Sequence, residues 1–207
     1  MVKPVEELSN AVLKRLGVVE NTTRCMIFSS QSAAQKFTAS LKASPVFSEN
    51  QHVEAVRFFM PSESNMGKSE THWANFSAII FPSELWKNAM AFWRDTGSGI
   101  SSRHAEYCMG ELDYLDSDSS SPRLRVPARK RRDHRQITPS LTRIQAAATS
   151  MNQLKAFLSH MATSDQAGQP RVSMDDVFLH PNGMNAIWSL SETLSSLNTN
   201  STVVAFG

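Results

Sequence analysis

Short apolar runs alternate with stretches of helical periodicity along the first 115 residues, and this alternation limits the possible folds most. Three apolar runs are consistent with strands, at 25–28, 53–60 and 76–81. Four stretches repeat apolar residues at helical spacing, at 5–16, 31–42, 84–94 and 104–115. Helices and strands are therefore interleaved, and the sequence predicts an α/β fold.

Composition excludes several classes of protein. The 207 residues carry 41% apolar residues and a net charge of +2, which suits a folded chain and implies no polyanionic partner. No apolar run approaches the roughly 20 residues that cross a bilayer, so no membrane association is expected. The N-terminus lacks the apolar segment of a signal peptide, which predicts a cytoplasmic protein. Cys25 and Cys108 are expected to be reduced, partly buried thiols, and the scattered histidines predict no metal site.

Residues 116–140 interrupt the alternation. They hold three prolines, an acidic and serine-rich start, and seven basic residues between Arg123 and Arg135. Low apolar content and high charge predict an exposed, disordered insert. A solvated insert is favoured over a nuclear signal or a nucleic-acid contact, because no aromatic residues interleave the basic run to stack on bases.

Residues 141–207 form the third predicted region. Helical periodicity resumes at 141–162, and the run at 177–180 predicts a strand that ends in a Pro-Asn-Gly turn. A helix is expected from about Met184, and the β-branched run at 202–207 predicts a second, parallel strand. This region therefore predicts a βαβ unit, with the regions 1–115 and 116–140 before it.

Two glycine-containing segments are candidates for binding an anion. The junction at 180–187 places a glycine at the start of a helix, where unpaired N–H groups and the helix dipole favour a phosphate. The segment Gly97–Arg103 sets small residues beside an arginine that can bind an anion bidentately. Taken alone, the junction at 180–187 is more often an ordinary turn, because it lacks the spacing of a known phosphate-binding loop, and Gly97–Arg103 is more often an ordinary loop with a solvated arginine.

Two long segments resemble one family. The segment FPSELWKNAMAFWRDTGSGISSRHAEYC, at 81–108, is similar to the signature of fungal cystathionine γ-synthases, in which a TGxGISSRxAEYC segment occurs. The segment DDVFLHPNGMNAI, at 175–187, resembles that group's strand and cofactor-phosphate turn. RCMIF at 24–28 and VVAFG at 203–207 add to the likeness, which covers nearly all of the chain outside 116–140.

The resemblance implies the N-terminal portion of a fold-type I, aspartate aminotransferase-like transferase with an incomplete sheet. Its cofactor is pyridoxal phosphate, and its reaction joins a thiol or another nucleophile to an activated homoserine ester. The resemblance implies that Gly183 and Met184 bind the cofactor phosphate through their backbone N–H groups, and that the amide of Asn182 adds a donor. Arg103 would reach the cofactor of a neighbouring subunit, in a homo-oligomer, whereas Ser101 replaces the tyrosine of the family's motif.

Catalysis in this family requires a lysine, and no lysine of this chain matches the required position. The family's catalytic lysine follows the phosphate turn, but the last of the eight lysines is Lys155, which precedes it. No catalytic residue is therefore assigned, and the chain is expected to be a truncated enzyme that is inactive alone. One alternative is a non-catalytic subunit that pairs with an intact paralogue, and another is a basic nuclear or nucleic-acid-binding protein.

Overall fold

The computed structural model describes residues 2–19, 21–61, 73–131, 141–166 and 168–197. Ten main elements occur in the order α1 (Lys3–Leu16), β1 (Thr23–Phe28), α2 (Gln31–Lys42), β2 (Glu54–Phe59), β3 (Phe76–Pro82), α3 (Trp86–Thr96), α4 (Ser102–Glu111), β4 (Asp116–Ser119), α5 (Leu141–Ala162) and α6 (Gly183–Leu197). The prediction of an α/β fold is confirmed, and each predicted helix is present. The three strands expected before residue 115 are also present.

Four strands form one antiparallel sheet in the order β1-β3-β2-β4. β3 lies between β1 and β2, with Ile80 opposite Cys25 on one side and Glu54 on the other. Six of the seven residues of β3 are buried, because the strand has neighbours at both edges and helices over both faces. This burial explains why FSAIIF is a continuous apolar run rather than an alternating one.

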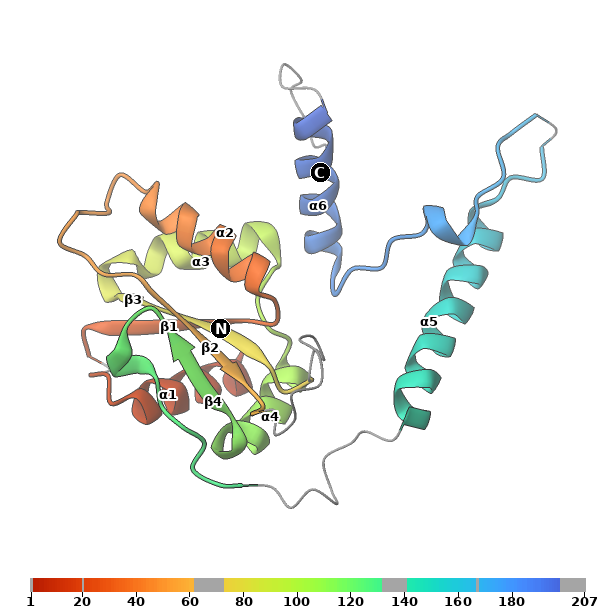
Figure 1. Ribbon diagram of the computed structural model, residues 1–207. Helices are drawn as coiled ribbons and strands as arrows, with labels where there is room; N and C mark the ends of the chain where they lie inside the picture. Colours follow the sequence, from red (N-terminus) through yellow and green to blue (C-terminus); the bar gives the residue numbers. More distant parts are fainter. Residues whose placement is uncertain (1, 20, 62–72, 132–140, 167, 198–207) are drawn as a thin grey trace.

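Helices cover both faces of the sheet, as Figure 1 shows, with α1 and α4 on one side and α2 and α3 on the other. Alternate residues of β1 point into the two cores: Ile27 packs with α1 and α4, whereas Met26 and Phe28 pack with α2 and α3. In the second core, Phe37 of α2 contacts Phe28, Phe81 and Phe92. The sheet is thereby enclosed in a three-layer arrangement.

The prediction of a disordered insert is wrong for residues 116–131. Residues 116–119 form β4, which pairs with β2, and Leu124 is only 1% exposed in the core beside α1 and α4. The serine hydroxyls make this polar segment foldable, because Ser117 donates to the carbonyl of Leu124 (2.7 Å) and Ser119 donates to that of Ala55 (2.8 Å). Residues 132–140 of the predicted insert lie outside the described residues.

The prediction of a strand at 177–180 is also wrong. These residues form no strand, and the Phe178 side chain is 78% exposed. A strand needs a neighbour for its backbone hydrogen bonds, and no described strand lies beside this segment. The second strand expected, at 202–207, lies outside the described residues, so the assignment to fold-type I remains a prediction.

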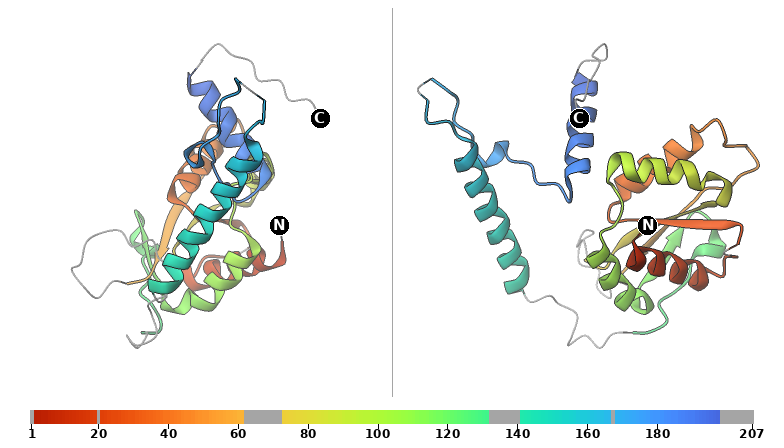
Figure 2. Two further views of the ribbon diagram at one scale, coloured as in Figure 1. Left: turned by 90° about the vertical axis from the view of Figure 1, so that its right-hand side faces the viewer. Right: turned by 180° about the vertical axis from the view of Figure 1, so that it is seen from behind.

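α5 and α6 carry exposed apolar side chains. On α5 these include Met151, Leu154, Phe157 and Met161, and on α6 they include Ile187, Leu190, Leu194 and Leu197. Figure 2 shows α5 standing apart from the sheet and its covering helices, whereas α6 lies against α3. Within the described ranges, no helix is long and apolar enough to span a bilayer.

Candidate functional site

The Pro-Asn-Gly turn begins α6, as the glycine-containing junction predicted. Asn182 precedes the helix, and its Oδ1 accepts a hydrogen bond from the backbone N–H of Asn185 (2.9 Å). The backbone N–H groups of Gly183 and Met184 have no partner among the described residues, and both residues are exposed. A Cβ added at Gly183 would meet open space. The positive end of a 15-residue helix therefore carries two N–H donors without a partner among the described residues.

The loop that follows α3 holds this turn. α3 ends at Gly97, which has a left-handed φ of +61° and donates its N–H to the carbonyl of Trp93 (3.0 Å). The Gly97 carbonyl accepts a hydrogen bond from Nδ2 of Asn182 at 2.9 Å. The Asn182 side chain thus caps α6 with its oxygen and binds the Gly97 loop with its nitrogen.

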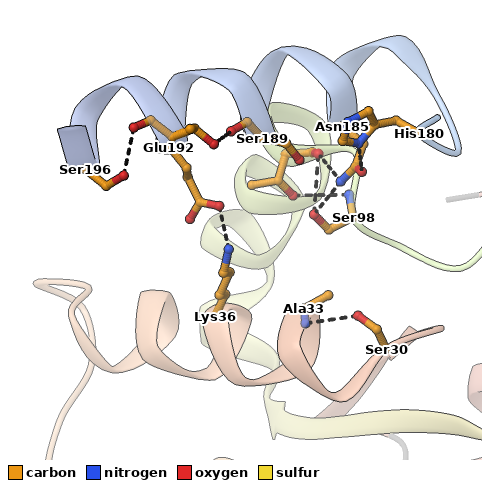
Figure 3. A network of polar contacts seen from close by, with 11 residues as sticks. Ser30, Ala33, Lys36, Ser98, His180, Asn185, Ser189, Glu192 and Ser196 are labelled. Atoms are coloured by element: carbon orange, nitrogen blue, oxygen red, sulfur yellow. Dashed lines mark hydrogen bonds and ion pairs between the residues drawn. The ribbon is translucent and has the colours of Figure 1, made fainter. Parts of the chain in front are cut away.

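Asn185 makes the second connection between the loop and the turn. Its Nδ2 donates to the carbonyl of Thr96 (3.3 Å) and to Oγ of Ser98 (3.2 Å), and its Oδ1 lies 3.3 Å from Nδ1 of His180. Figure 3 shows this cluster at the first turn of α6. Further along α6, Glu192 forms an ion pair with Lys36 of α2. α6 is consequently attached both to the loop at 96–98 and to α2.

The contact is close enough to require glycine at position 97. A Cβ added there would lie 2.4 Å from Oδ1 of Asn182 and 2.9 Å from the backbone nitrogen of Asn185. Both approaches are shorter than van der Waals contact, and the left-handed φ disfavours other residues as well. The Gly97 backbone therefore sits directly against the cap of α6.

The predicted site residues are only partly brought together. Asn182, Gly183 and Met184 lie side by side at the turn, whereas Arg103 is exposed on α4 and forms no hydrogen bond or ion pair with these three residues. A role for Arg103 at a neighbouring subunit's cofactor therefore remains a prediction. Sequence reasoning missed Asn185, because its side-chain amide binds Thr96 and Ser98, which are distant in the sequence. It also proposed Gly97 as part of a separate anion site and did not connect it with Asn182.

The thiols and the nearby histidine offer no reactive pair. Cys25 and Cys108 are buried free cysteines, and burial raises the pKa of each thiol to about 12. Nε2 of His104 instead donates a hydrogen bond to the Trp73 carbonyl (2.7 Å), and the imidazole stacks on the Trp73 ring. No group of three or more potential metal-ligating side chains occurs in the part of the chain that the structure describes.

Acidic side chains accompany the basic run in its described part. Arg123 pairs with Glu54, Arg125 with Asp118, and both Arg129 and Lys130 with Asp113. Neutralised cations contribute little to a phosphate-backbone contact. The geometry therefore gives no support to a nucleic-acid interface at 123–131.

Residues 4–101 match the family described as the N-terminal domain of fungal trans-sulfuration enzymes. Just under half of the chain therefore matches a domain of fungal trans-sulfuration enzymes. The matched domain spans α1 to α3 and includes the 96–98 loop that holds the turn. The resemblance to fungal cystathionine γ-synthases is thereby confirmed.

Three curated relatives extend the likeness. A cystathionine gamma-synthase-like protein, ankD of Aspergillus thermomutatus, is 31% identical over 99% of this chain and 35% of its own length. A cystathionine gamma-synthase-like enzyme of Amanita muscaria is 23% identical over 98% of this chain and 39% of its own length. The alanine racemase ungC of Aspergillus violaceofuscus is 30% identical over 56% of this chain and 19% of its own length.

The chain spans little more than a third of the length of the cystathionine gamma-synthase-like relatives that it matches. No solved structure matches the chain significantly.

Proposed function

We propose that this chain supplies the N-terminal domain and the cofactor-phosphate turn of a pyridoxal-phosphate-dependent transferase. In the family reaction, a thiol or another nucleophile replaces the activated oxygen group of a homoserine ester. The likeness to cystathionine gamma-synthase-like proteins over 99% of the chain supports this proposal. At the site itself, the proposal is supported by the backbone N–H groups of Gly183 and Met184, which have no partner among the described residues.

The residues present fit the cofactor's phosphate in part. The N–H groups of Gly183 and Met184 are exposed, and the space beyond Gly183 is open, so a phosphate could approach both donors. Asn182 fits less well, because its Oδ1 and Nδ2 already bind Asn185 and Gly97. When bound, pyridoxal phosphate supplies an electron sink for chemistry at the amino-acid substrate.

A binding experiment tests the phosphate turn. Pyridoxine 5′-phosphate is a suitable probe, since it carries the phosphate but no aldehyde that would react with surface lysines. We expect it to slow amide exchange in the first turn of α6, whereas pyridoxine without phosphate should not. Met184→Pro should weaken this protection, because proline removes one N–H donor and is tolerated in a first helical turn. Equal protection by both ligands would contradict a phosphate site.

We also propose that the chain alone does not perform the transfer. All eight lysines precede the turn, and none matches the family's catalytic position. After incubation with pyridoxal phosphate and borohydride, we expect scattered substoichiometric lysine adducts and no turnover of homoserine esters. One stoichiometric adduct together with turnover would show that this chain is a complete catalyst.

A second candidate function is a subunit that binds a related, longer polypeptide. The exposed apolar side chains on one stripe of α6, from Ile187 to Leu197, favour it, because contiguous exposed apolar surface is typical of protein interfaces. Co-expression with a full-length cystathionine gamma-synthase-like paralogue should yield a mixed oligomer. If only separate species purify, this candidate is excluded.

A further inference from the structure

We propose that Gly97, Asn182 and Asn185 form a docking contact that positions the phosphate turn on the N-terminal domain. The proposal gives Asn182 a positioning role in place of the direct phosphate contact that the family resemblance implies. The proposal rests on the proposed function only where it names the turn as a phosphate site. The hydrogen bonds of the docking contact are part of the structure itself.

The first argument is how the turn is supported. The segment 177–180 forms no strand, so the sheet does not fix the direction in which α6 begins. Among the described residues, the first turn of α6 is instead joined to the loop at 96–98 by three side-chain hydrogen bonds from Asn182 and Asn185. That loop therefore fixes the end of α6 that carries the Gly183 and Met184 N–H groups, whereas the Lys36–Glu192 ion pair and the packing against α3 hold the helix further along.

The second argument is the use of both ends of the Asn182 amide. Its Oδ1 caps Asn185 and its Nδ2 binds the Gly97 carbonyl, so one side chain links the helix cap to the loop. Serine or threonine at this position could accept the capping bond through a single hydroxyl. Neither has an amide that would simultaneously donate to Gly97 in this geometry. Asparagine at 182 is thus suited to docking as well as capping.

The third argument is steric and concerns Gly97. The position next to its Cα is occupied by the cap of α6, at 2.4 Å from Asn182 Oδ1. A methyl group there would force the loop and the turn apart. Gly110 offers a matched control, because a Cβ at that exposed position of α4 would meet nothing within 4 Å.

Hydrogen exchange of the full chain without ligand tests the docking. Gly97→Ala and Asn185→Ala should each speed exchange in the first two turns of α6 by about five-fold, as loss of a helix-capping contact typically does. Exchange in β3 should stay unchanged and would report that the domain remains folded. Gly110→Ala should match the wild type. If α6 exchanges at the wild-type rate in both docking variants, the contact is not maintained in solution and the proposal is overturned.

Asn182→Ser separates docking from capping. The hydroxyl should keep the Asn185 amide protected, but the segment 164–182 should be cut more readily by protease because the turn is no longer held to Gly97. Unchanged proteolysis would show that the Asn182 amide does not contribute to docking.

The positioning role is tested by pyridoxine 5′-phosphate. Protection of the first turn of α6 by this probe should weaken at least five-fold in Asn185→Ala and Gly97→Ala, whereas Gly110→Ala should bind as the wild type does. Full protection in the docking variants would overturn the positioning role. If the wild type itself shows no phosphate-dependent protection, the proposed phosphate site fails, and the ligand-free exchange rates still decide whether the docking exists.

Discussion

At the scale of single residues, Arg15 is a charged residue buried within the domain. Its side chain is 6% exposed, donates to the carbonyls of Leu115 and Pro127, and lies 5.6 Å from the centre of the Phe58 ring. Burial lowers the pKa of its guanidinium, and nearby Arg129 adds to this effect. Its Nε and Nη1 atoms are buried without a hydrogen-bond partner. Arg15 therefore fastens the segment after α4 to the C-terminal end of α1.

Arg15→Met should lower the free energy of unfolding by about 2–3 kcal/mol. Methionine keeps much of the apolar stem but leaves two backbone carbonyls without a charged donor. Urea denaturation measures the change. Arg24→Met is the control, because Arg24 is exposed beside the Trp86 ring and its loss should cost about 1 kcal/mol or less. Equal losses in the two variants would show that the carbonyl contacts of Arg15 are not stabilising.

The two thiols should react only after the domain unfolds. With a pKa of about 12 for both Cys25 and Cys108, almost no thiolate is present at pH 8 in the folded chain. A thiol reagent such as Ellman's should thus modify neither cysteine in native protein and both in urea. Since the folded pKa lies above the ordinary value near 8.5, the contribution to stability is complete below pH 8 and declines as the pH rises from about 8.5 towards 12. Rapid modification of one native thiol would contradict this burial.

At the scale of elements, β4 and the turn after it depend on one apolar residue. Leu124→Ala should lower the free energy of unfolding by about 2–4 kcal/mol and expose 116–131 to trypsin, because it empties a fully buried position. Arg123→Ala, which removes an exposed partner of Glu54, should cost less than about 1 kcal/mol. If trypsin cuts both variants at the same rate, Leu124 does not anchor the segment.

The same elements show what the sequence could predict. α2 begins and ends at the predicted residues, because its apolar spacing is local and Ser30 caps it. β4 was not predictable, because its serines are stabilised by carbonyls as distant as that of Ala55. The glycine turn was predictable from local residues, whereas its contact with Gly97 joins positions 85 apart. Local patterns contain no information on such pairings.

At the scale of the whole molecule, the apolar stripe on α6 should make the isolated chain self-associate. Ile187 and Leu194 are 63% and 45% exposed on the same side of the helix. Replacing both with glutamate should lower the weight-average mass in sedimentation equilibrium at high protein concentration. Replacing Ser195 and Ser196 with glutamate controls for the added charge. An equal drop in mass in the two variants would assign the effect to charge rather than to the stripe.

The position of β3 between β1 and β2 has a consequence for synthesis on the ribosome. β1 and β2 both precede β3 in the chain but do not pair with each other. β1 and β2 cannot form their backbone hydrogen bonds with β3 until residue 82 has left the ribosomal exit tunnel. β4 can pair with β2 and complete the sheet only after residue 119 has left it. The nascent chain must therefore keep its first two strands unpaired for tens of residues. This delay makes the helices α1 and α2 the only elements of the domain that can form before then.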